Sequence, residues 1–164
     1  MAEIPIPSRE FRRVLGGFAS GVTVITAMVD GVPVGMTCQS FFSLSLDPPL
    51  VAFSPSRRSA SYPLIRQSGS FCVNILEASQ QALCEQFSRT GTDKWKGVSW
   101  TTGVTGSPLL EGALASIDCR LDQELETGDH YLTIGRVVEL DAVEGREPLL
   151  FFNGGYERLC GTAA

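Results

Sequence analysis

The stretch "GMTCQSF" carries polar side chains directly after an apolar segment. Within four positions it places Thr37, Gln39 and Ser40 around a cysteine, Cys38. Hydroxyl and amide groups, with the backbone N–H groups beside them, suit a flat heteroaromatic ligand whose edge alternates donors and acceptors. A serine-rich turn that caps a helix is the other interpretation of such a stretch.

A second polar stretch, "SPSRRSAS", lies between an apolar run and the expected start of a helix. From position 54 to 59 it holds three serines and two arginines. Arginine supplies a charged fork, serine supplies donors, and the start of a helix adds a positive dipole. The stretch is therefore a reasonable phosphate site, and the other interpretation, favoured by the stretch alone, is a serine-rich turn that caps the helix.

His130 is the only histidine of the chain, and it follows the pair Gly128–Asp129 in "ETGDHYLTIGRVVEL". A histidine after such a turn is either a solvated turn residue or a residue directed at a ligand. On the strand that it opens, Leu132 and Ile134 share its face. His130 is therefore expected where a core face meets the rim of the domain.

Other common catalytic constellations are not found in the sequence. It has no G-x-S-x-G elbow, no Walker A motif and no G-x-G-x-x-G fingerprint. With one histidine and no C-x-x-C pair, no metal site is expected. We interpret the cysteines as buried free thiols; they are Cys38, Cys72, Cys84, Cys119 and Cys160.

The charge of the chain argues against nucleic acid as a partner. The formal net charge is -5, whereas phosphate backbones are bound by clustered lysine and arginine. No apolar run approaches the ~20 residues of a membrane span. The N-terminal sequence "MAEIPIPSREFRR" has no basic region followed by an apolar core, so we expect no signal peptide and a cytoplasmic location.

Periodicity predicts the elements that must position these residues. "FRRVLGGFASG" has helical spacing, with Ser8 as a possible N-cap. Asp30-Gly31 predicts a tight hairpin in "GVTVITAMVDGVPVGMTCQ", and Pro33 suggests that its second strand has an exposed edge. "FFSLSL" alternates strictly, while "LVAFS" and "SFCVNIL" are apolar runs typical of buried strands.

The second half of the chain continues this pattern. Gly69 is expected to end a short helix, and "SQQALCEQFSRTG" predicts another, with Ser79 as its N-cap. Residues 90–112 form a loop-rich region with both tryptophans. From Ala113 to Glu126 apolar and polar residues alternate, and we interpret the acidic residues, Asp118 among them, as a solvated face.

Six to eight strands, two or three short helices and no βαβ alternation indicate a mainly β protein. We expect an antiparallel β-barrel with helical decoration. The sequence shows no internal repeat, linker or low-complexity segment. One domain over 1–164 is the simplest account.

The order and spacing of "GVTVIT", "VGMTCQSFFSLSLDPPLVAFS", "RRSASYPLI", "GSFCVNIL", "GDHYL" and "LLFFNGGYERL" resemble the short-chain flavin reductases, the flavin reductase-like, FMN-binding split-barrel family. The resemblance covers about residues 8–160. It is most specific from Gly35 to Ser54, and next in the GDH turn. It implies an FMN-binding split β-barrel that is antiparallel and Greek-key-like.

The resemblance also implies a set of binding residues. The segment from Met36 to Ser40, including Cys38, would lie along the isoalloxazine ring, with Thr37, Gln39 and Ser40 at its pyrimidine edge. Many members have Asn where this chain has Gln39. The flavin phosphate would be held by Ser54, Ser56, Arg58 and Ser59. The remaining positions implied are Asn74 beside the flavin and His130 and Tyr156 at the nicotinamide.

The activity implied is NAD(P)H:flavin oxidoreduction. NADH is favoured over NADPH because the sequence has no dense basic patch to bind the 2′-phosphate of NADPH. FMN or FAD would be reduced and passed to a separate oxygenase, and the protein would be a homodimer. Alternatives are an FMN-retaining oxidoreductase of the pyridoxamine-phosphate-oxidase type and a non-enzymatic flavin- or haem-binding module. An oligonucleotide-binding barrel is disfavoured by the acidic charge.

Overall fold

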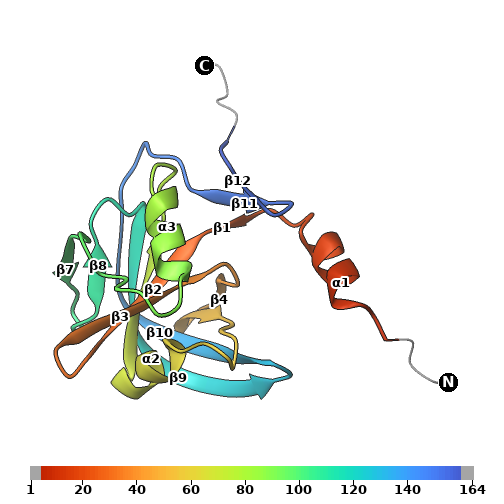
Figure 1. Ribbon diagram of the computed structural model, residues 1–164. Helices are drawn as coiled ribbons and strands as arrows, with labels where there is room; N and C mark the ends of the chain where they lie inside the picture. The colour runs from red at the N-terminus through yellow and green to blue at the C-terminus, as the bar shows by residue number, and fades with distance from the viewer. Residues whose placement is uncertain (1–4, 160–164) are drawn as a thin grey trace.

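The structure, a computed structural model, describes residues 5–159 (Figure 1). Its helices in this range are α1 (Ser8–Leu15), α2 (Tyr62–Ser68) and α3 (Gln81–Ser88). The strands are β1 (Ser20–Gly21), β2 (Thr23–Val29), β3 (Val32–Cys38), β4 (Phe42–Leu46), β5 (Pro49–Phe53), β6 (Ser70–Ile75), β7 (Trp100–Thr102), β8 (Pro108–Leu110), β9 (Ala115–Thr127), β10 (His130–Ala142), β11 (Leu150–Phe152) and β12 (Gly155–Glu157).

Seven strands form one antiparallel sheet in the order β3-β2-β6-β9-β10-β5-β4. Its two edge strands, β3 and β4, are consecutive in the chain. Only residues 39–41 separate Cys38 from Phe42, so the two edges are within about 14 Å of each other at that corner. The sheet therefore curls back on itself, which confirms the predicted mainly β, split-barrel architecture.

The predicted hairpin at Asp30-Gly31 joins β2 to β3. Both residues have positive φ, 50° and 78°, which is the conformation that Asp-Gly favours in a two-residue turn. Pro33 lies opposite Met28 on the edge strand, as its missing N–H requires. The turn thereby fixes the register of β3, the strand that carries the "GMTCQ" segment.

The core has two parts. Inside the curled sheet, Phe53 packs edge-on against Tyr62 and Phe71, and all three rings are buried. Outside it, Phe87 of α3 packs against Trp95 in a second cluster with Val22, Val24, Leu76, Cys84, Leu110 and Leu149. The second cluster attaches α3 to the sheet and so places the chain that follows this helix.

The interpretation of the acidic residues of 113–126 as a solvated face is wrong for Asp118. This residue is 1% exposed, and its carboxylate accepts hydrogen bonds from the Thr105 N–H (2.7 Å) and hydroxyl (2.5 Å). Thr105 lies in the turn between β7 and β8, a hairpin within the region predicted as loop-rich. This hairpin covers β9 at Asp118, whereas Arg120 and Glu126 on the same face are exposed.

The ends of two helices also differ from the predictions. α1 ends at Leu15 instead of continuing through residues 16–21, and Ser8 is its first residue, after Pro7 in the N-cap position. α3 follows Gln80 as its N-cap, because Ser79 donates its N–H and hydroxyl to the Glu77 carboxylate instead. The predicted end of α2 is confirmed, since Gly69 is left-handed with a φ of 69°.

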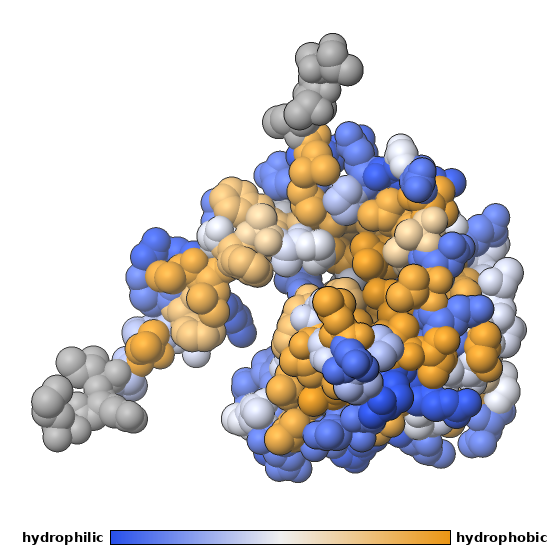
Figure 2. Space-filling view, turned by 180° about the vertical axis from the view of Figure 1, so that it is seen from behind, coloured by the Kyte–Doolittle hydropathy of each residue, from blue (hydrophilic) through white to orange (hydrophobic). Residues whose placement is uncertain are grey.

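Helix α1 projects from the body of the molecule (Figure 1). Its apolar residues Phe11, Val14 and Leu15, with the following Phe18, are 54–81% exposed. Figure 2 shows hydrophobic residues along this arm and on the part of the body that it faces. The edge strand β4 is similar, since Phe42, Leu44 and Leu46 are 45%, 42% and 90% exposed.

The cysteine interpretation is confirmed for the four that the structure describes: Cys38, Cys72, Cys84 and Cys119 are buried free thiols. Burial raises the pKa of Cys72 to about 12. Cys160 lies outside the described residues. Of the helices described between residues 5 and 159, none combines the length and apolarity that crossing a membrane requires.

Candidate functional site

A cavity of about 630 Å³ opens between the edge strand β3, the polar loop before α2, and α3 with the loop that follows it. Its volume is that of a pocket for a cofactor-sized ligand. The lining residues are Pro33, Val34, Gly35, Met36, Thr37, Gln39, Arg58, Ser59, Ala60, Ser61, Leu64, Phe87, Ser88, Thr90, Gly91, Thr92, Asp93, Lys94 and Trp95.

Three residues predicted for the ring of the ligand, Met36, Thr37 and Gln39, lie on the β3 wall of this cavity. The Thr37 hydroxyl donates to the Cys84 carbonyl oxygen at 2.8 Å, so it fastens β3 to α3. That proton is therefore engaged within the protein, and Thr37 keeps its backbone and oxygen lone pairs for a ligand. Gln39 is exposed and lines the cavity, and within residues 5–159 its amide has no hydrogen-bond partner.

Two residues predicted for the phosphate, Arg58 and Ser59, line the same cavity from the loop before α2. A tight turn shapes this loop, because the Ser59 N–H donates to the Ser56 carbonyl oxygen (3.0 Å) and the Arg58 N–H to the Ser56 hydroxyl (3.2 Å). The Ser59 hydroxyl in turn accepts the Tyr62 N–H at 3.2 Å. Ser56 thus holds the loop in shape, and Arg58 and Ser59 face the cavity.

Ser40 and Ser54 join two strand ends instead of lining the cavity. The Ser40 oxygen accepts the Ser54 N–H, and its hydroxyl donates to the Ser54 carbonyl oxygen, both at 2.9 Å. The Ser54 hydroxyl donates to the Tyr131 carbonyl oxygen at 2.7 Å. These bonds connect the end of β3 to the start of the polar loop and to β10, and so set the distance between the two predicted ligand regions.

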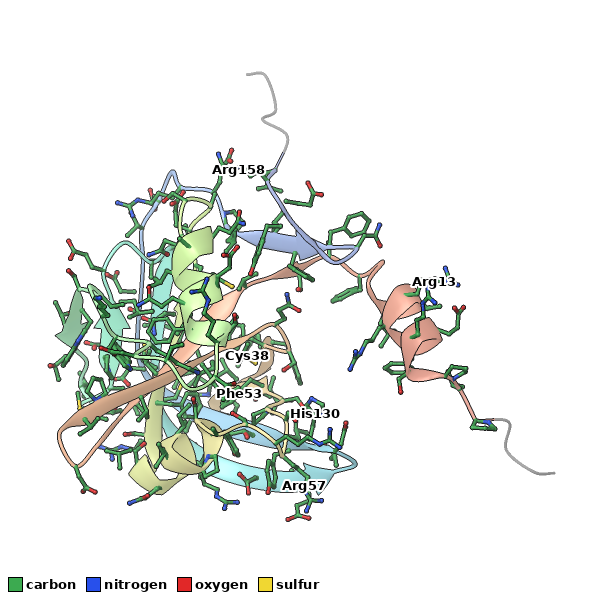
Figure 3. The ribbon with its side chains drawn as sticks, viewed as in Figure 1. Arg13, Cys38, Phe53, Arg57, His130 and Arg158 are labelled. Atoms are coloured by element: carbon green, nitrogen blue, oxygen red, sulfur yellow. The ribbon has the colours of Figure 1, made fainter. Side chains whose placement is uncertain are left out.

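The structure does not bring Cys38 or Asn74 to the cavity. Cys38 is 6% exposed and belongs to the inner core (Figure 3), where burial raises the pKa of its thiol. Asn74 is fully buried, donates to the Val24 carbonyl oxygen (3.2 Å) and the Thr26 hydroxyl (3.0 Å), and accepts the Leu110 N–H (2.8 Å). Its amide holds β2, β6 and β8 together.

His130 lies beside the polar loop and outside the cavity. Residues 130 and 56 form an antiparallel bridge, and the Arg57 N–H donates to the Asp129 carbonyl oxygen at 3.0 Å. The imidazole Nδ1 is 2.7 Å from Asp129 Oδ1, and this hydrogen bond holds the pKa of Asp129 below its usual value. The side chain is 43% exposed, at the same end of the molecule as Arg57 (Figure 3). One ring nitrogen is oriented by Asp129, and the other is free for a ligand.

Tyr156 is also separate from the cavity. Its hydroxyl lies 3.2 Å from the Cys84 sulfur, and its ring packs edge-on against Phe151. Burial raises the pKa of this phenol. Tyr156 therefore contacts α3. The Cys84 carbonyl oxygen of the same helix accepts the hydrogen bond from the Thr37 hydroxyl, so Tyr156 is connected to the cavity only through α3.

Lys94 is a cavity residue that the sequence analysis missed. Its ammonium donates to the Gly35 carbonyl oxygen at 3.2 Å and to the Ser61 hydroxyl at 3.1 Å. Partial burial lowers its pKa. Residues 90–112 were predicted to be a loop-rich region. A lysine in a polar loop has no sequence feature that distinguishes a cavity residue from a surface residue. The signal present was its neighbour Trp95, whose packing against Phe87 anchors the loop at this point.

The chemistry of the lining residues fits a flat ligand with an anionic tail. Amide and backbone groups lie on the β3 wall, while Arg58 and Lys94 lie at the polar loop. Across residues 5–159 neither cation forms an ion pair, although the chain has a net charge of -5. Unpaired cations at a concave surface are typical of a site for a phosphate group.

Comparison with known proteins agrees with this chemistry. The model of the "Flavin reductase like domain" family matches residues 15–159. The chain is 50% identical over 151 residues to the reductase subunit HsaB of a flavin-dependent monooxygenase from Rhodococcus jostii, covering 92% of this chain and 77% of that protein. It is 38% identical over 151 residues to the FMN reductase (NADH) SmoA of Agrobacterium fabrum, covering 92% and 86%.

A solved structure gives the same result. The Streptomyces globisporus NADH:FAD oxidoreductase SgcE6, in complex with NAD and FAD fragments, superposes with a TM-score of 0.91 at 34% identity. The match covers 99% of this chain and 100% of that one. The similarity therefore includes both the sheet and the loops that form the cavity.

Proposed function

The chain belongs to the flavin reductase-like domain family, and on that premise we propose that it is a flavin reductase that uses NADH to reduce FMN or FAD for a separate oxygenase. The observation that carries the proposal is the cavity of about 630 Å³ between β3 and the polar loop, which Gln39, Arg58 and Ser59 all line. The relatives HsaB and SmoA have this type of activity in their names.

When bound, the isoalloxazine ring accepts the hydride and thereby supplies the chemistry that no side chain of this cavity provides. The protein must hold the ring, leave one of its faces open to nicotinamide, and exclude competing geometries. Strand β3 does the first, because Met36, Thr37 and Gln39 line one wall and the Gln39 amide carries both a donor and an acceptor. Thr37 keeps that wall in place through its bond to α3.

The phosphate of the flavin is assigned to Arg58 and Ser59. Both line the cavity, and Ser56 holds their turn in shape. The bonds from Ser40 to Ser54 fix this loop relative to β3. The ring-binding wall and the phosphate loop therefore form one rigid unit, which is what precise orientation of a substrate requires.

His130 is assigned to nicotinamide recognition. It lies next to the polar loop, and its Nδ1 is engaged by Asp129, so Nε2 is the nitrogen directed outward. Because the cofactors carry the hydride transfer, we assign His130 to positioning the nicotinamide nucleotide and not to acid or base catalysis. The cavity walls carry no dense group of cations beyond Arg58 and Lys94, in support of NADH over NADPH as the donor.

A homodimer is part of the proposal. The arm α1 and the edge strand β4 expose large apolar side chains, among them Phe18 (81%) and Leu46 (90%). Exposed apolar surface of this extent favours association. Residues 1–164 are taken as one domain, and a cytoplasmic location, where NADH is available, follows from the proposed activity.

Gel filtration after incubation with FMN tests the proposed mode of action. A reductase that releases its product loses the yellow colour and regains NADH oxidation when flavin is added back. Retained colour with activity on an organic substrate would instead support the pyridoxamine-phosphate-oxidase type. Flavin binding without NADH oxidation would identify a non-enzymatic module. Running the assay with NADH and NADPH in parallel determines the donor.

A further inference from the structure

The tip of the β9–β10 hairpin, which carries His130, extends past the rest of the sheet (Figure 1). Strand β6 pairs with β9 only as far as Arg120, and β5 pairs with β10 only from Thr133 onward. Residues 127–129 at the tip are exposed. The orientation of the His130 imidazole therefore depends on contacts that the neighbouring strands do not provide.

The polar loop before α2 provides backbone contacts on both sides of His130. The Arg57 N–H donates to the Asp129 carbonyl oxygen, and the Tyr131 N–H donates to the Pro55 carbonyl oxygen, both at 3.0 Å. The residues directly before and after His130 are thus bonded to the same loop. Because one peptide unit separates them, the position of Tyr131 sets the position of the His130 backbone.

The ring of Tyr131 makes three further contacts. The guanidinium carbons of Arg57 and Arg66 lie 5.9 Å and 5.7 Å from its centroid. A guanidinium within about 6 Å of an aromatic centroid is attracted to the ring. The buried ring of Tyr62 lies 5.3 Å away, tilted by 32°. These contacts are made by the ring itself, so they do not require the phenol hydroxyl of Tyr131.

Two of the residues around this ring are fixed to the sheet. The Glu124 carboxylate of β9 accepts hydrogen bonds from the Tyr62 hydroxyl and from Arg66 (3.0 Å), both residues of α2. The Tyr62 hydroxyl also lies 2.6 Å from the Thr133 hydroxyl of β10. Tyr131 therefore packs against a part of α2 that cannot move independently of the two strands.

We propose that Tyr131 is a positioning residue, whose ring holds the His130 turn in the orientation that presents the imidazole to the nicotinamide nucleotide. This inference rests on the proposed function. Successive side chains of a strand point to opposite faces, so the ring of Tyr131 and the imidazole of His130 lie on different faces of β10. Tyr131 acts on the nucleotide through His130 and does not touch it.

The test is the KM for NADH of the full chain, measured by steady-state kinetics at saturating FMN. Tyr131→Leu removes both cation–π contacts and is expected to raise this KM about fivefold, with kcat changed by less than about twofold. Tyr131→Phe keeps the ring and should restore most of the wild-type KM. A purely structural defect would lower kcat by reducing the folded fraction and would leave the KM unchanged.

The His130→Ala background shows whether Tyr131 acts through the imidazole. There, Tyr131→Leu should change the KM by less than about twofold, because the side chain that it positions is absent. Arg136→Gln is the control, since it removes an ion pair (2.9 Å, to Asp122) from the same two strands and should leave the KM unchanged.

A similar rise of the KM in both backgrounds, or no rise in the wild-type background, would overturn the inference. Wild-type protein that oxidises no NADH with FMN or FAD would contradict the proposed function, and the inference with it.

Discussion

The Thr37 hydroxyl donates to the Cys84 carbonyl oxygen at 2.8 Å and joins the strand that lines the cavity to helix α3. From the same helix, Gln86 holds the backbone of Lys94, which reaches back to Gly35 on β3. The strand, the helix and the loop thus form a closed set of contacts around the cavity. We therefore expect flavin binding to depend on that frame as well as on the residues that would touch the ligand.

Removing the Thr37 hydroxyl is expected to weaken the frame. Thr37→Val leaves the Cys84 carbonyl without this donor and should lower the free energy of unfolding by about 1 kcal/mol. Chemical denaturation followed by tryptophan fluorescence measures the change. Thr37→Ser keeps the hydroxyl and should lose less. A Thr37→Val variant as stable as the wild type, with the loss confined to Thr37→Ser, would mean that the methyl group, and not the hydrogen bond, stabilises this contact.

Asn74 is expected to act on stability alone. Asn74→Ala leaves the buried Leu110 N–H without its acceptor, so the free energy of unfolding should fall by about 2 kcal/mol. The FMN affinity of the folded variant should equal that of the wild type, because Asn74 lies outside the cavity. Gln39→Ala is the complementary control, with weaker FMN binding and unchanged stability. A large loss of FMN affinity in Asn74→Ala would show that Asn74 does contribute to flavin binding.

His130→Ala is expected to raise the KM for NADH with little change in kcat, since the imidazole is placed to orient the nicotinamide nucleotide. The rise should be about tenfold, the value of one hydrogen bond to a charged group. Asp129→Asn should shift the KM in the same direction by less, because Asp129 acts only through Nδ1 of His130. Steady-state kinetics measure both variants. A His130→Ala enzyme with wild-type KM and kcat would exclude this role.

The exposed apolar edge predicts a dimer. Sedimentation should give about twice the 17.7 kDa mass of the chain. Leu46→Lys places a charge at a residue that is 90% exposed on β4 and should weaken the dimer at least about tenfold. Val104→Lys, at a similarly exposed apolar residue of the β7–β8 turn, serves as the control. A wild-type chain that sediments as a monomer at all concentrations would contradict the dimer.

Local sequence patterns predicted those features that depend on local backbone geometry. Asp30-Gly31 and Gly69 adopt the positive φ that their turn and helix end require. The buried strands 50–53 and 71–75 followed from apolar runs. Of the stretch "SPSRRSAS", Arg58 and Ser59 line the cavity, and its role as a phosphate loop stays a prediction.

Features that depend on contacts between distant segments could not be predicted in this way. Alternation along β9 cannot indicate that the β7–β8 hairpin covers Asp118. The position of Asn74 on a strand beside the cavity does not show that its amide is directed into the core. Lys94 belongs to a polar loop, and only the packing of Trp95 and the bonds from Gln86 bring it to the cavity.

Steady-state NADH oxidation by the purified protein, measured as free FMN or FAD is added, tests the central claim most directly. The claim is that a flavin enters the cavity between β3 and the polar loop and leaves it reduced. The rate is expected to be near zero without flavin, to rise with flavin concentration and to saturate. No stimulation of NADH oxidation by either flavin at any concentration would contradict the claim.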